Sequence, residues 1–300
     1  MNDICLSFNL DNNLFRGRIV RLDKVLADIM APHTYSENIT AAMAETTALG
    51  VMLASLMKYE GYFTLQMQGD GPISVLVTDV TSRGEVRTAV KFDAAKMQAA
   101  QELRKTEGEL EATPHWLGKG SLIFTVDQGK NTDLYQGIVD LQGKTLAECA
   151  MRYFKQSEQI DTYLRLFVRQ NKNGKWQAAG ILIQKMPTKG GKENDAEINV
   201  ADLWNEAKIL TDSLQEKEIF DTQLSLQDIL YRLFHEHQVA VNKESEYHFG
   251  CRCSRDKLFT TLSNMKSEDL DSLVEDGEIT ATCNFCGQTY SFDKGELIKH

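Results

Sequence analysis

Four cysteines near the C-terminal end place the strongest constraint on how this chain folds. Cys251 and Cys253 form a CxC pair, and Cys283 and Cys286 form a CxxC pair. Zinc prefers a tetrahedral set of sulfur and nitrogen ligands, and two short-spaced cysteine pairs separated by a small subdomain supply one. A module of about 50 residues is near the size at which a hydrophobic core alone becomes marginal. The spacing therefore predicts one four-thiolate zinc site that folds a module over residues 247–300.

The chemistry of such a site is limited by its ligands. Four cysteines leave no open position for a substrate, which argues against catalysis at the metal. The thiolates themselves can be oxidised. Sulfur atoms around zinc lie about 3.8 Å apart, whereas a disulfide requires about 2.05 Å. Oxidation would therefore break the site and release the ion, although spacing alone favours an inert structural site over such a switch.

The composition indicates the class of protein. The chain has 300 residues, of which 42% are hydrophobic, enough for one large domain and smaller units. No basic start precedes an apolar run, and no segment approaches the roughly 20 apolar residues that span a bilayer. We therefore expect neither a signal peptide nor a membrane span. The net charge of -10 argues against nucleic-acid binding.

The cysteine usage predicts the compartment. Six cysteines are few for this length, and a secreted disulfide framework would spread them through a small chain. We expect a cytoplasmic protein with reduced thiols. Cys149 lies on the apolar side of a predicted helix and reads as a buried thiol. Cys5 is interpreted as an exposed accessory thiol.

Alternation, helical periodicity and turn residues predict the fold class. The expected strands span residues 14–20, 62–68, 73–79, 86–92, 122–127, 134–140, 163–169 and 176–184. The expected helices span residues 22–30, 39–58, 94–105 and 200–214, with two more that begin at Thr145 and Ser225. Strands joined by hairpins and mixed with helices predict an α+β fold with antiparallel sheets.

A polar, glycine-containing break at residues 188–195 suggests the domain organisation. We expect an N-terminal α/β core domain over residues 1–188, a helical linker region over 189–246 and the zinc module over 247–300. The two linker helices each carry an apolar face and are too short to be stable alone, so each needs a partner. These faces contain Trp204, Leu210, Leu230, Leu233 and Phe234. We expect ordinary core packing for them while the thiols are reduced.

Other candidate sites have plainer interpretations. Gly69-Asp70-Gly71 reads as a hairpin turn and not a phosphate loop, because no Lys-Ser/Thr follows it. His235 and His237 are two residues apart on a helix and face different directions, which argues against a metal pair. Arg252, Arg255 and Lys257 flank the first cysteine pair and either offset the charge of the site or are solvated. No Ser/His/Asp or Cys/His arrangement indicates an enzyme.

Several segments resemble one known family, in the order in which the family has them. They are QMQGDGPISVLV at 66–77, YQGIVDLQGKTLAECAMRYFKQSEQIDT at 135–162, ILYRLFHEH at 229–237, FGCRCSRDK at 249–257 and EDGEITATCNFCGQTYSF at 275–292. The chain is similar to the thirty-three-kilodalton heat-shock chaperonins, which are redox-regulated bacterial holdase chaperones.

The resemblance implies a mechanism for the four cysteines. The reduced protein with one bound zinc ion would be inactive. Peroxide with heat, or hypochlorous acid, would join Cys251 to Cys253 and Cys283 to Cys286, release zinc, unfold the module and loosen the linker. Apolar surface would then bind unfolding client proteins without ATP, and the active form is expected to be a homodimer.

Two functions of other classes stay open at this point. One is a zinc-ribbon interaction module that binds RNA or ribosomes, which predicts salt-sensitive binding with zinc retained. The other is a thiol oxidoreductase that uses Cys283 and Cys286, which predicts turnover of disulfides and requires one attacking thiol free of metal.

Overall fold

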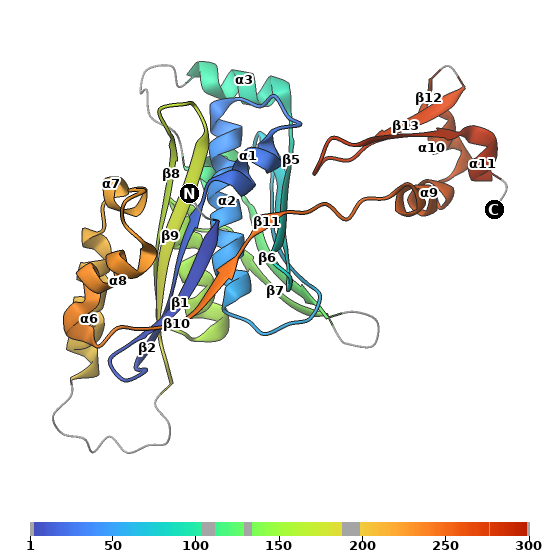
Figure 1. Ribbon diagram of the computed structural model, residues 1–300. Helices are drawn as coiled ribbons and strands as arrows, with labels where there is room; N and C mark the ends of the chain where they lie inside the picture. Colours follow the sequence, from blue (N-terminus) through green and yellow to red (C-terminus); the bar gives the residue numbers. More distant parts are fainter. Residues whose placement is uncertain (1–2, 104–111, 129–133, 188–198, 276, 299–300) are drawn as a thin grey trace.

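The computed structural model describes residues 3–103, 112–128, 134–187, 199–275 and 277–298 (Figure 1). Among these residues the strands form three sheets. The first has the order β10-β1-β2-β9-β8 and is antiparallel throughout. Its strands are β1 (Ile4–Leu10), β2 (Phe15–Leu22), β8 (Thr162–Gln170), β9 (Trp176–Lys185) and β10 (Ala240–Glu246).

The second sheet has the order β11-β5-β4-β3-β6-β7 and is antiparallel except for the β11–β5 pair. Its strands are β3 (Tyr62–Gly69), β4 (Ile73–Thr81), β5 (Glu85–Phe92), β6 (Gly120–Asp127), β7 (Tyr135–Asp140) and β11 (His248–Phe249). The predicted hairpin turn at Gly69-Asp70-Gly71 joins β3 to β4. The α+β class with antiparallel sheets is therefore confirmed.

Helix α2 (Glu37–Ser55) lies between these two sheets (Figure 1). The helix is rich in Ala, Leu and Met and is buried along most of its length, because sheets cover it on both sides. Two of its threonine hydroxyls, those of Thr40 and Thr47, are hydrogen-bonded. The hydroxyl of Thr47 lies 2.7 Å from that of Thr88 on β5, which lies 2.8 Å from that of Thr78 on β4. This buried chain of hydroxyls fixes α2 against the second sheet.

The linker helices cover the outer face of the first sheet (Figure 1). They are α6 (Val200–Ser213), α7 (Glu216–Ile219) and α8 (Leu226–Phe234). The Trp204 ring centroid lies 5.4 Å from that of Phe15, and the Phe234 ring centroid lies 6.0 Å from that of Phe8. Leu210, Leu230 and Leu233 belong to the same core. Ordinary core packing of these side chains is confirmed, and their partner is the first sheet.

The sequence did not predict β1, β10, β11 or the strands of the C-terminal module. Strand β10 (AVNKESE) is polar and largely exposed, and it pairs with β1 from Ile4 opposite Glu246 to Asn9 opposite Ala240. The chain then joins the second sheet through β11 (Figure 1). The chain between α8 and the cysteines thus contains extended segments that are hydrogen-bonded to both sheets of the body.

Of the remaining helices of the body, all except the short one at Thr113–Leu117 lie close to where the sequence placed them. They are α1 (Lys24–Met30), α3 (Ala94–Leu103), the short α4 (Thr113–Leu117), α5 (Leu146–Tyr153) with the π-helical turn η1 (Phe154–Glu158), and the 3-10 turn η2 (His235–His237). Thr145 caps α5 by accepting a hydrogen bond from the Glu148 N–H. The break at residues 188–195 and the end of the 94–105 helix lie outside the described residues.

The C-terminal module has its own small core. It contains α9 (Arg255–Ser263), α10 (Ser267–Asp271), β12 (Val274–Glu275), β13 (Glu278–Thr282), β14 (Thr289–Asp293) and α11 (Lys294–Ile298). Only five side chains of this cluster are buried, namely Leu262, Leu270, Ile279, Phe292 and Leu297. The module projects from the body beside the second sheet, with α10 and α11 farthest away (Figure 1).

Gly17 on β2 gives a prediction about the first sheet. It lies directly opposite Phe8, and an added Cβ would lie 2.1 Å from the Phe8 Cζ atom. Phe8 is fully buried, so its ring has no free space to enter. We expect Gly17→Ala to lower the free energy of unfolding by about 1–3 kcal/mol, as measured by urea denaturation. Adding Phe8→Leu should restore part of the loss, and unchanged stability of the single variant would contradict this packing.

Candidate metal centre

The four C-terminal cysteines meet at the end of the module that faces the body. Cys251 and Cys253 lie in the loop between β11 and α9, and Cys283 and Cys286 lie in the turn between β13 and β14. Their four sulfur atoms all lie within 4.8 Å of one another. The Sγ atoms are 3.8 Å apart for Cys251 and Cys283 and 3.4 Å apart for Cys253 and Cys286.

Backbone geometry shapes the CxxC turn. The Gly287 N–H donates to the Cys283 carbonyl at 2.8 Å, and the Cys283 N–H donates to the Gln288 carbonyl at 2.9 Å. Gly287 has φ +68°, and a Cβ there would lie 2.7 Å from the Cβ of Pro32, which follows α1 in the body. Glycine is therefore required both by the turn and by the approach of the body.

The donor set fits a zinc ion. Sulfur ligands on a zinc tetrahedron lie about 3.8 Å apart, close to the Cys251–Cys283 and Cys253–Cys286 distances. In the part of the chain that the structure describes, these cysteines form the only such group of three or more candidate ligands. His237 is buried with Nδ1 2.8 Å from an oxygen of Asp11, whereas His235 is exposed, so the two rings have different surroundings.

The thiols of Cys251 and Cys286 are not electrostatically equivalent. Burial raises the pKa of the Cys251 thiol, but the Cys253 backbone N–H, neighbouring thiols and the Arg87 guanidinium outweigh it and lower the pKa to about 7. For Cys286, burial and contacts with the other thiols raise the pKa to about 12. Of these two thiols, Cys251 more readily carries the negative charge that metal binding requires.

Two body residues at this site were missed from the sequence. Arg87 on β5 has Nη1 3.8 Å from the Cys251 sulfur and its guanidinium carbon 3.9 Å from the Phe285 ring centroid. Asp79 on β4 accepts hydrogen bonds from Arg87 and from Arg252. Alternation along β4 and β5 places both side chains on the outer face, but only the fold shows that the module lies there.

The three basic residues beside the first cysteine pair have specific partners. Arg252 donates to Asp79 at 2.6 Å and stacks 3.7 Å from the Tyr62 ring centroid. Arg255 pairs with Glu296 at 2.8 Å, and Lys257 donates to the Arg252 carbonyl at 2.8 Å. The sequence offered two roles for these residues, offsetting the charge of the cysteine site or simple solvation. Arg252 has a third role, because it connects the module to the body.

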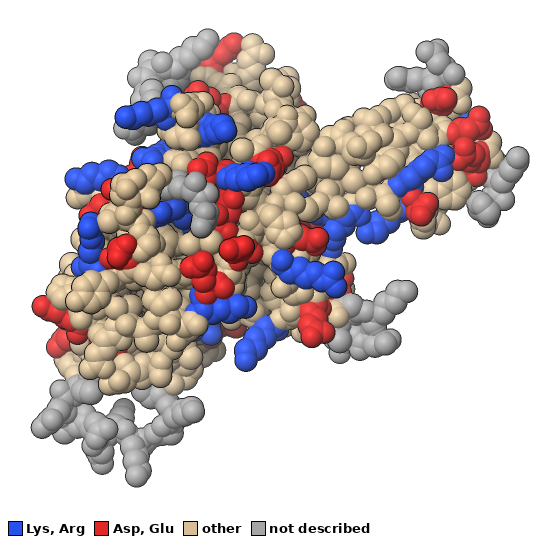
Figure 2. All heavy atoms as spheres, in the orientation of Figure 1, with Lys and Arg blue, Asp and Glu red and all other residues tan. Residues whose placement is uncertain are grey.

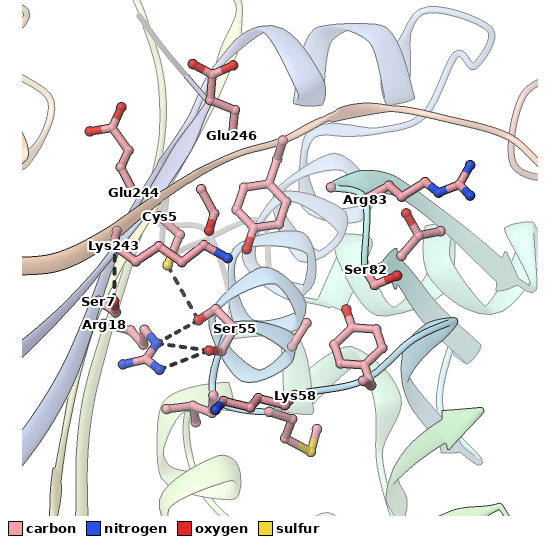
Figure 3. Close-up of a pocket in the computed structure, with 18 of the residues that line it drawn as sticks. Cys5, Ser7, Arg18, Ser55, Lys58, Ser82, Arg83, Lys243, Glu244 and Glu246 are labelled. Atoms are coloured by element: carbon pink, nitrogen blue, oxygen red, sulfur yellow. Dashed lines mark hydrogen bonds between the residues drawn. The ribbon is translucent and has the colours of Figure 1, made fainter. Parts of the chain in front are cut away.

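The two remaining cysteines are both buried. Cys149 is 1% exposed, as predicted. The prediction of an exposed Cys5 was wrong, because this residue lies on β1 with 2% exposure. Its sulfur lies 3.6 Å from the Ser55 hydroxyl at the wall of a cavity of about 950 Å³ (Figure 3). Burial raises the pKa of the Cys5 thiol to about 11, so it is a poor nucleophile.

Comparisons with known proteins agree with this architecture. The family model described as Hsp33 protein matches residues 3–293. The 33 kDa chaperonin of Caulobacter vibrioides is 34% identical over 98% of this chain and 95% of its own. That of Shewanella loihica is 34% identical over 98% of this chain and 94% of its own. The crystal structure of the 33 kDa chaperonin from Thermotoga maritima has a TM-score of 0.78 at 21% identity, covering 99% and 97% of the two chains.

The two-sheet body with a clustered four-cysteine module defines an α+β protein with a C-terminal candidate metal centre. The chain belongs to the Hsp33 family, so the resemblance found in the sequence is confirmed. Relatives of this family are named chaperonins, which supports a chaperone function. Within the described ranges, no helix is both long enough and apolar enough to cross a membrane.

Proposed function

We propose that this protein is a redox-regulated holdase chaperone of the cytoplasm, which prevents aggregation of unfolding proteins under oxidative stress. The observation that carries the proposal is the gathering of four thiols at the junction of a small module with a chaperone-family body. The protein needs no ATP and no catalytic turnover for this role. Its partners are unfolding client proteins and, after oxidation, a second copy of the chain.

In the reduced state the four thiolates of Cys251, Cys253, Cys283 and Cys286 would hold one zinc ion. A bound ion supplies on the order of 10–16 kcal/mol to the folding of a small peptide module. The five buried side chains of the module form a core too small to replace this contribution. The folded module is therefore the reduced, inactive form.

Oxidation removes the ligands in pairs. Each pair of thiolates loses two electrons to one hydrogen peroxide molecule, which takes up two protons from water and becomes two water molecules, and the pair forms one disulfide as its bonds to zinc break. We propose the pairs Cys251–Cys253 and Cys283–Cys286. Contacts at 3.8 and 3.4 Å join sulfurs of different motifs, which are 32 and 33 residues apart in sequence. Once the module opens, loop-closure entropy favours the short loops within each motif.

Loss of the module would act on the apolar core of the linker. The chain between α8 and the cysteines runs through β10 and β11, which are hydrogen-bonded to both sheets. Unfolding of the module frees this segment at one end and weakens the packing of α6–α8 on the first sheet. The apolar faces of these helices and of the sheet then become the surface that binds clients.

Treatment with hydrogen peroxide at elevated temperature tests the proposal. We expect about one zinc ion per chain to be released and aggregation of a heat-denatured client to be suppressed in the same samples. Zinc is measured with a chromogenic chelator and aggregation by light scattering. Zinc release with undiminished client aggregation would refute the chaperone switch, and the reduced protein is the control.

The disulfide pairing has its own test. Peptide mapping of the oxidised protein should recover Cys251 linked to Cys253 and Cys283 linked to Cys286. Cross-motif links such as Cys251–Cys283 would contradict the scheme. In Cys283→Ser, peroxide should not produce the wild-type release of zinc and suppression of client aggregation. In Cys149→Ala both responses should be normal, because Cys149 is buried in the body.

Surface charge gives no support to RNA or ribosome binding as the main function. On the face shown in Figure 2, acidic and basic side chains are interspersed. The net charge of -10 opposes contact with phosphate backbones.

A further inference from the structure

We propose that Asp79 and Arg87 on the outer face of the second sheet are positioning residues that dock the four-cysteine site on the body and slow its oxidation. Together with Arg252 of the module they form what we call the docking bridge. This inference rests on the proposed redox function, since it concerns the regulation of the same site.

Strand register builds the body half of the docking bridge. Thr64, Asp79 and Arg87 lie directly opposite one another on β3, β4 and β5. The neighbouring Thr78 and Thr88 point inward to α2 and are fully buried. Because side chains alternate along a strand, the row Thr64–Asp79–Arg87 is on the opposite, outer face.

The Asp79 carboxylate lies between two guanidinium groups. One of its oxygens accepts from Arg87 Nε at 2.8 Å, from Arg87 Nη2 at 2.6 Å and from Arg252 Nη2 at 2.6 Å. The other oxygen accepts from the Thr64 hydroxyl at 2.6 Å. The Asp79 side chain is only 8% exposed, so this contact is shielded from water. Without the carboxylate, two cations would face each other across the junction of body and module.

Arg87 contacts both halves of the cysteine site. Its guanidinium approaches the Cys251 sulfur of the CxC pair and lies over the Phe285 ring within the CxxC pair. A single body side chain therefore contacts both cysteine motifs, and beside Cys251 it limits the approach of an oxidant to that sulfur. The Arg252 guanidinium, stacked on Tyr62, fixes the CxC loop from the other side.

The backbone adds a second attachment beside the bridge. Phe249 on β11 pairs with Val86, the residue before Arg87, and the Gly250 N–H donates to the Val86 carbonyl at 3.1 Å. The CxC motif begins at the next residue. Opening of the site at Cys251 therefore requires both the side-chain bridge and this short strand to separate, so loss of the bridge should speed opening.

The rate of zinc release from the full-length, zinc-loaded chain tests this inference. At fixed peroxide concentration and temperature, Arg87→Gln and Asp79→Asn should each release zinc about tenfold faster than wild type, as expected for loss of one partner of a shielded charge pair. Arg252→Gln, which leaves the sheet unchanged, should do the same. Lys91→Gln is the matched control, because Lys91 is an exposed residue on the same strand.

Further variants separate positioning from general destabilisation. Asp79→Glu keeps the charge and should recover most of the wild-type rate. The effects of Asp79→Asn and Arg252→Gln on the rate of zinc release should not add in the double variant, because both substitutions remove the same Asp79–Arg252 contact. Hydrogen exchange should rise at residues 249–253 while the body keeps its thermal midpoint.

The possible outcomes distinguish this inference from the proposed function. Wild-type release rates in all three single variants, or additive effects in the double variant, would overturn the docking bridge. Faster release in the variants supports the bridge even if the oxidised wild-type chain fails to suppress client aggregation. That failure would refute the chaperone switch alone.

Discussion

Removal of zinc is expected to unfold the C-terminal module and leave the two-sheet body folded. The module buries five side chains in its own cluster, whereas the body has two extensive cores. Structural zinc contributes on the order of 10–16 kcal/mol to small modules, which equals or exceeds the stability of a typical domain at about 5–15 kcal/mol. Hydrogen exchange after treatment of the reduced protein with a strong chelator measures the result. Protection should be lost over residues 255–298 and retained in α2 and the central strands.

A single ligand substitution should have the same effect as chelation. Cys283→Ser leaves three thiolates and is expected to abolish protection in the module. Cys149→Ala removes a buried thiol outside the cluster and should cost only about 1 kcal/mol, with the module unchanged. Persistent protection of residues 255–298 in the chelated protein would show that the module folds without metal.

Weakening the packing of α8 is expected to produce chaperone activity without an oxidant. Phe234 is fully buried against Phe8 in the core between the linker helices and the first sheet. Phe234→Ala should cost about 3–5 kcal/mol of packing and loosen α6–α8. The reduced variant should then bind a hydrophobic dye and suppress aggregation of a heat-denatured client, as measured by fluorescence and light scattering.

Tyr231 provides the matched control for this experiment. It lies on the same helix, but its side chain is 66% exposed, so Tyr231→Ala should behave as the wild-type chain does. Dye binding by Phe234→Ala without any suppression of client aggregation would exclude this apolar surface as the client site. Equal activity of the two variants would point to an effect unrelated to the core.

Local patterns in the sequence predicted most of the fold. The hairpins, the buried helix between the sheets and the four-cysteine cluster depend on alternation, apolar periodicity and short spacings, which neighbouring residues determine. Strand β10 was missed because its sequence AVNKESE is polar and its pairing with β1 joins residues as far apart as Ser7 and Lys243. The wrong prediction for Cys5 follows from the omission of β1, because this strand places Cys5 in the core of the body.

The clustering of the four cysteines was predicted from the sequence, but the surroundings of the cluster were not. Cys251, Cys253, Cys283 and Cys286 are identified by spacing alone. Asp79 and Arg87 are ordinary polar positions on two alternating strands, β4 and β5. No neighbouring residue in the sequence indicates that they contact the cysteines. Their contact with the module depends on the path of the chain through β10 and β11, which only the three-dimensional structure provides.

The interior position of β1 in its sheet has a consequence for biosynthesis. β1 is made first, but one of its two neighbours, β10, is made last among the strands of that sheet. At synthesis rates of about 5–20 residues per second, the two are separated by on the order of 10–50 s. During that interval the β1 edge is open on the ribosome and can pair with other nascent chains. A protein proposed to prevent aggregation thus has its own period of exposure before its first sheet is complete.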